Sequence, residues 1–76
     1  MDLNFFNKKN EEQESFEQVL EHSIEVEEDL MRTYLITAER VHDDDDELKE
    51  RLENFAEGNA KRTKQLLDEL NDQKEK

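Results

Sequence analysis

The chain has 76 residues, of which 23 are acidic and 11 are basic, so its formal net charge is −12. It contains one Gly and no Pro, Cys or Trp. This length allows one domain, and the absence of Cys excludes disulfides and Cys-based zinc sites. No apolar run approaches the roughly 20 residues of a membrane span, and phosphates repel so acidic a chain. We therefore expect a cytoplasmic protein that binds neither membranes nor nucleic acid directly.

The balance of charge and hydrophobicity is also typical of disordered chains, but the residue types favour helices. Pro is absent, Gly occurs only at Gly58, and the abundant Glu, Lys, Leu, Arg and Gln are good helix formers. Apolar residues recur at steps of three and four, and no segment alternates with a period of two. The sequence therefore predicts an all-α protein.

The N-terminal segment, residues 1–10, is apolar at Leu3, Phe5 and Phe6 and then basic. We expect it to be a flexible or capping segment outside the helices. Two interpretations remain open: it folds back over the end of the helices, or it is a docking peptide for a larger partner.

The first helix is predicted over residues 11–42. Ser15 and Gln18 have the spacing of a capping box, although the glutamates before them allow an earlier start. Val26 and Ile36 lie off the apolar stripe and are expected to be exposed or to contact a partner. Glu27 lies where the stripe expects an apolar residue. The stripe consists of Phe16, Val19, Leu20, Ile24, Leu30, Met31, Tyr34, Leu35, Ala38 and Val41.

An acidic turn, Asp43, Asp44, Asp45 and Asp46, separates the helices. Asp44 followed by Glu47 has capping-box spacing and predicts the start of the second helix. The alternating ligands and the Gly of an EF-hand loop are missing, so only weak, nonspecific cation binding is expected here.

The second helix is predicted over residues 45–71, with a frayed tail over 72–76. The short turn predicts an antiparallel hairpin. Asn59 and Arg62 occupy positions where the second stripe lacks an apolar residue. The stripe consists of Leu48, Leu52, Phe55, Ala56, Ala60, Leu66, Leu67 and Leu70.

A single hairpin has a small core. Below about 80 residues one core rarely supplies more than about 3–5 kcal/mol without disulfides or metals. We therefore expect a homodimer in which two hairpins form a four-helix bundle. The alternative is a marginal hairpin that folds only on another protein.

The polar residues on the stripes are predicted to form a polar core cluster. In a hairpin that turns near residues 43–44, Glu27 faces about position 60, level with Asn59 and Arg62. A buried carboxylate must be paired, protonated or bound to metal, and Arg62 and Asn59 suffice to pair it. The alternative is that Glu27 lies hydrated at the edge of the stripe.

The hairpin resembles those of ferritin-like and rubrerythrin-like proteins over about residues 16–70. Glu27 precedes Tyr34 by seven residues, as a ligand Glu precedes an aromatic residue in that family. An acidic turn then leads into Leu48-Lys49-Glu50. Asn59 and Arg62 stand where the resemblance implies a Glu-x-x-His ligand pair.

The resemblance implies a ferritin-like shape whose metal site is degenerate. Arg62 has no free lone pair for a metal, Asn59 is a weak ligand, and only Glu27 of the ligand set remains. We therefore expect no metal, no cofactor and no enzymatic activity. His22 and His42 are expected at the surface.

Three functions are compatible with these features. The first is a non-catalytic, dimeric interaction or regulatory module for an unknown protein partner with a basic surface. The second is an acidic nucleic-acid mimic that inhibits a DNA-binding protein. The third is a ferritin-like metal-binding module. Residues 1–50 hold 17 acidic and 5 basic residues, whereas residues 51–76 hold 6 of each, so the first helix and the turn are expected to face the basic partner.

Overall fold

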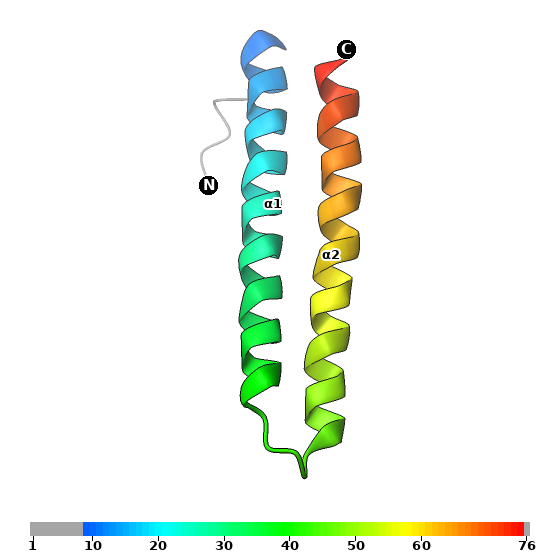
Figure 1. Ribbon diagram of the computed structural model, residues 1–76. Coiled ribbons are helices and arrows are strands. Elements are labelled where there is room, and N and C mark those ends of the chain that lie inside the picture. The colour runs from blue at the N-terminus through cyan, green and yellow to red at the C-terminus, as the bar shows by residue number, and fades with distance from the viewer. Residues whose placement is uncertain (1–8, 76) are drawn as a thin grey trace.

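A computed structural model describes residues 9–75, with side chains from residue 15 onward. It consists of two α-helices, α1 (Lys9–Arg40) and α2 (Asp46–Lys74). The helices lie side by side and antiparallel, so that the start of α1 and the end of α2 meet at one end of a hairpin 55 Å long (Figure 1). The predicted all-α helical hairpin is confirmed. Neither described helix is long and apolar enough to cross a membrane.

The helix bounds differ from the predicted ones by one to three residues. α1 begins at Lys9, before the Ser15 capping box, and ends at Arg40. α2 begins at Asp46 and continues to Lys74, so the predicted frayed tail is wrong up to that residue. No helix breaker interrupts residues 72–74, and a lysine is favourable at the negative end of the helix dipole. Leu3, Phe5 and Phe6 lie outside the described residues.

The turn shows why α2 starts one residue later than expected. The Asp45 N–H donates to the His42 carbonyl oxygen at 2.9 Å. Asp45 is the N-cap, and its carboxylate accepts from the Leu48 N–H at 3.2 Å. The prediction that Asp44 caps the helix is therefore wrong. With Asp45 as the cap, the third helical residue is Leu48, so the predicted capping box with Glu47 does not form.

The hairpin interior follows a heptad pattern, in which core positions alternate between steps of three and four. Buried or half-buried side chains occupy these positions in both helices. Over residues 15–75, the buried apolar side chains are Ile24, Ala38, Leu52, Ala56 and Leu70. The heptad positions are Leu20, Ile24, Glu27, Met31, Tyr34, Ala38 and Val41 in α1, and Leu52, Ala56, Asn59, Thr63, Leu66, Leu70 and Gln73 in α2.

Much of the predicted apolar stripe lies outside this interior. Seven of its large side chains are at least 39% exposed, while Val26 and Ile36 are exposed as predicted. Two helices bury only one narrow row of positions on each helix, and the stripes are wider than that row. The seven exposed stripe residues are Phe16, Val19, Leu30, Leu35, Leu48, Phe55 and Leu67.

Candidate interaction site

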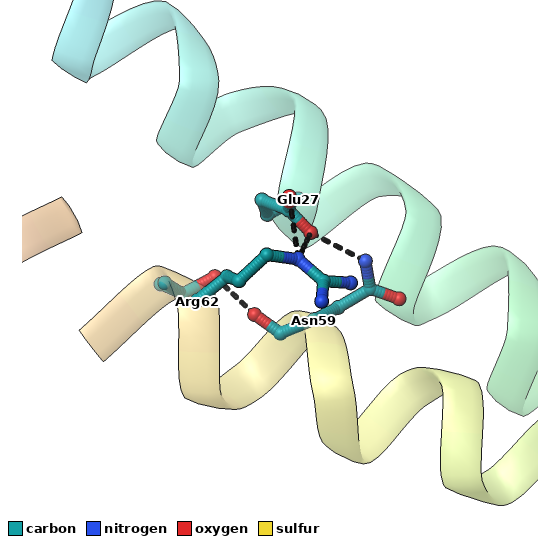
Figure 2. Close-up of polar contacts among 4 residues, drawn as sticks. Glu27, Asn59 and Arg62 are labelled. Carbon is teal, nitrogen blue, oxygen red and sulfur yellow. Dashed lines mark hydrogen bonds and ion pairs between the residues drawn. The ribbon is translucent and has the colours of Figure 1, made fainter. Parts of the chain in front are cut away.

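The three residues of the predicted polar core cluster come together, with Glu27 of α1 meeting Asn59 and Arg62 of α2 (Figure 2). They lie near the middle of their helices, and so near mid-length of the hairpin. Asn59 Nδ2 donates to Glu27 Oε1 at 2.5 Å. Arg62 Nε lies 3.1 and 3.0 Å from the two Glu27 carboxylate oxygens. The Glu27 side chain is only 18% exposed, which argues against the alternative of a hydrated carboxylate at the edge of the stripe.

The cluster stabilises the charged form of Glu27. The hydrogen bond from Asn59 lowers the pKa of Glu27 below its ordinary value, desolvation opposes this shift, and the hydrogen bond and positive charge of Arg62 add to it. Asn59 is 2% exposed, and its Oδ1 has no hydrogen-bond partner within the described structure. The hydrogen bond from Asn59 Nδ2 to Glu27 therefore determines which way the amide group points. The flipped amide would place Asn59 Oδ1 against the Glu27 carboxylate, where two acceptors would repel each other.

Thr63 lies one turn after Asn59 and is half-buried in the interior. The predicted stripes contain only apolar residues and therefore do not include it. Its hydroxyl donates to the Asn59 carbonyl oxygen at 2.9 Å, which satisfies the hydroxyl within α2. A threonine can therefore occupy a half-buried heptad position without a partner from α1.

The chemistry of the cluster does not fit the metal that a ferritin-like resemblance implies. Glu27 is the only strong oxygen ligand among the three, and both of its oxygens accept hydrogen bonds from α2. Arg62 offers a metal no lone pair. Within the described residues, no group of three or more His, Cys, Asp or Glu side chains is placed to hold a metal ion.

The two broad sides of the hairpin differ in composition. On the first, grooves lined by Leu30, Tyr34 and Phe55 and by Leu20, Ser23 and Leu66 meet at Glu27 and Arg62. We call this side the neutral face. Its flanking positions, read from the heptad pattern, are Phe16, Val19, Ser23, Val26, Leu30, Thr33, Thr37 and Arg40 in α1, and Leu48, Arg51, Phe55, Gly58, Arg62, Gln65, Glu69 and Asp72 in α2.

The neutral face has few charges and many exposed apolar side chains. It carries three basic and two acidic residues at these flanking positions. Six of the nine exposed large hydrophobic side chains in the described part of the chain lie on it. Tyr34 and Phe55 pack across the helices here, with ring centroids 5.5 Å apart, and Phe55 is still 52% exposed.

The opposite side, which we call the acidic face, contains a smaller groove lined by Met31, Leu35, Ala56 and Ala60. Its flanking positions hold seven acidic and three basic residues, and only two exposed large hydrophobic residues, Leu35 and Leu67. The flanking positions are Gln18, Glu21, Glu25, Glu28, Arg32, Leu35 and Glu39 in α1, and Glu50, Glu53, Glu57, Ala60, Lys64, Leu67, Asn71 and Lys74 in α2.

The remaining predicted residues lie at the surface. The four aspartates of the acidic turn are exposed, and Asp45 serves as the helix cap. His22 and His42 are exposed, as predicted.

No protein-family model, curated protein or solved structure matches the chain. The ferritin-like resemblance therefore stays a prediction.

Proposed function

We propose that this chain is a non-catalytic protein-interaction module that works as a dimer of hairpins and presents acidic surface to a partner protein with a basic surface. The observation that carries the proposal is the placement of the apolar side chains. Among residues 15–75, nine large hydrophobic residues are 39–52% exposed, whereas the buried apolar side chains are those of three large residues and two alanines. Exposed apolar patches of this kind mark association surfaces.

The small interior supports association because it leaves much of the apolar surface in water. Burying such surface is favourable by about 25 cal/mol per Å², and a second protein surface can supply that burial. The polar cluster has a role in this proposal as well. We propose that the pairing of Glu27 with Arg62 fixes how α1 and α2 are aligned, because a shift of either helix would separate the paired charges.

The distribution of charge supports the choice of a basic partner. The acidic residues gather on the acidic face and at the turn, so that a basic protein surface approaching either would be attracted from a distance. Such attraction raises association rates and is weakened by salt. We also propose that the protein is located in the cytoplasm. Fluorescence microscopy of the tagged chain tests this location.

Light scattering on the purified protein, combined with affinity capture, tests this function. We expect a mass of twice 9.2 kDa and a captured protein whose purified form binds the chain with an affinity that falls as salt rises. A monomer at 100 µM would contradict the dimeric module. A purified partner whose affinity does not depend on salt would contradict the charge-guided interaction.

A further inference from the structure

We infer that a second copy of this chain covers the neutral face, in a two-fold arrangement that places the two acidic turns at opposite ends of the dimer. This inference depends on the proposed dimer and adds to it the face and the orientation. The neutral face and the acidic face are the two alternatives for self-association along the length of the hairpin.

Charge selects the neutral face. Each chain carries a formal net charge of −12, so two copies repel each other unless they meet where acidic residues are few. The neutral face has two acidic residues among its flanking positions and the acidic face has seven. A partner with the same charge therefore fits the neutral face, and the acidic face is left for a basic partner.

Apolar surface selects the same side. Of the nine exposed large hydrophobic residues that the structure describes, six lie on the neutral face, including Leu30 on α1 and Phe55 on α2. The hairpin is 55 Å long, and two packed helices are about 20 Å wide. The face thus offers about 1,000 Å², which exceeds the roughly 800 Å² that each partner buries in a standard-size interface.

The acidic turn selects the orientation. Residues 43–47 are five consecutive acidic residues. If the two hairpins lay parallel, ten carboxylates would lie side by side at one end. In the antiparallel arrangement the turns are separated by most of the length of the dimer, far beyond the Debye length of about 8 Å at physiological salt.

The residues at the centre of the neutral face are compatible with a two-fold axis that passes through this point. The ion pair between Arg62 and Glu27 lies at mid-length, and the Arg62 side chain is 55% exposed on this face. In the antiparallel arrangement the two ion pairs lie near the axis, where their charges balance. No unpaired charge then has to be buried at the centre of the interface.

A matched pair of variants tests the face. Leu30→Glu changes the neutral face and Leu35→Glu the acidic face; the two leucines are 39% and 43% exposed on the same helix. We expect light scattering to give a dimer for the wild type and for Leu35→Glu, and at least a tenfold weaker dimer for Leu30→Glu. A dimer that Leu35→Glu weakens and Leu30→Glu preserves would overturn the inference while leaving the proposed function intact. A monomeric wild type would overturn both.

A distance measurement tests the orientation without disturbing the interface. The chain has no Cys, so a nitroxide attached to Asp43→Cys reports a single distance between the two turns. We expect about 50 Å for the antiparallel arrangement, from the rise of 1.5 Å per helical residue on either side of the centre. A distance below about 25 Å would show parallel hairpins and overturn the inference, whatever the result of the Leu30→Glu variant.

Discussion

Arg62 reaches across the hairpin to Glu27, 35 positions away in the chain, and its Nε donates to both carboxylate oxygens at 3.0 and 3.1 Å. The hydrogen bond from Asn59 and, after it, this contact with Arg62 lower the pKa of the Glu27 carboxyl group from its ordinary value of 4.5. The cluster therefore couples the packing of α1 and α2 to the protonation of one residue.

The stability that Glu27 contributes should depend on pH. Because its pKa is lower in the folded state, the contribution is fully present above pH 4.5 and is lost as the pH falls through the folded pKa. Urea unfolding of the wild type and of Glu27→Gln should differ at pH 7, and the difference should shrink below pH 4.5. Glu25→Gln, at an exposed position of the same helix, controls for net charge. A difference that grows on acidification would contradict the assigned role of Glu27.

Gly58→Ala should stabilise the protein by about 0.5–1 kcal/mol, because glycine in a helix interior is less favourable than alanine by this amount. A Cβ at position 58 would lie 3.5 and 3.6 Å from the terminal nitrogens of Arg62, which is ordinary contact. Chemical unfolding followed by circular dichroism measures the effect. Destabilisation by alanine would contradict this prediction and would mean that the second copy inferred to cover the neutral face approaches the backbone closely at Gly58.

Asp45→Ala should destabilise the protein by about 1 kcal/mol, the usual effect of losing an N-cap side chain. Its carboxylate accepts the hydrogen bond from the Leu48 N–H. Asp44→Ala removes the same charge from the preceding residue of the turn and should change stability by about 0.5 kcal/mol or less. Thermal unfolding of both variants compares them, and a larger loss for Asp44→Ala would place the cap where the sequence pattern predicts it.

Leu70→Ala should cost about 2–3 kcal/mol, because this side chain is 7% exposed in the interior of the hairpin. Leu67, three residues earlier, is 44% exposed on the acidic face. Its replacement by alanine should cost about 0.5 kcal/mol. Urea midpoints measured at one protein concentration give the comparison, and equal losses would be inconsistent with the packing of α2.

Iron and manganese titrations should show no tight, stoichiometric binding. Glu27 is engaged by Asn59 and Arg62, and an arginine cannot ligate a metal. Isothermal titration calorimetry, with elemental analysis of the purified protein, measures this directly. One tightly bound ion per chain, or one per pair of chains, would instead support the metal-binding alternative.

Much of the fold could be predicted from the sequence, because helix periodicity and a short turn leave few arrangements. The register that pairs Glu27 with Asn59 and Arg62 follows from the position of the turn alone. The capping-box spacing of Asp44 and Glu47 predicted the wrong cap, since each of the four adjacent aspartates is a good N-cap residue. In the structure, the hydrogen bond from the Asp45 N–H to the His42 carbonyl oxygen closes the turn, and Asp45 is the residue that caps α2.

The extent of the interior was less predictable. Leu48 and Phe55 belong to the apolar stripe, yet both are exposed in the hairpin. Burial at the edge of a stripe depends on how many helices surround it, which periodicity does not encode. Thr63 was missed for a different reason: its hydroxyl is satisfied within α2, a contact that hydropathy does not register.

The turn also determines how the chain finds its structure. Contacts between the helices span 21 positions at Tyr34 and Phe55 and 32 to 35 positions at the polar cluster. Closing a shorter loop loses less chain entropy, so the contacts nearest the turn form most readily and the open end closes last. The hairpin should therefore fold as a zipper that starts at the turn, and amide hydrogen exchange should be fastest at the opposite end.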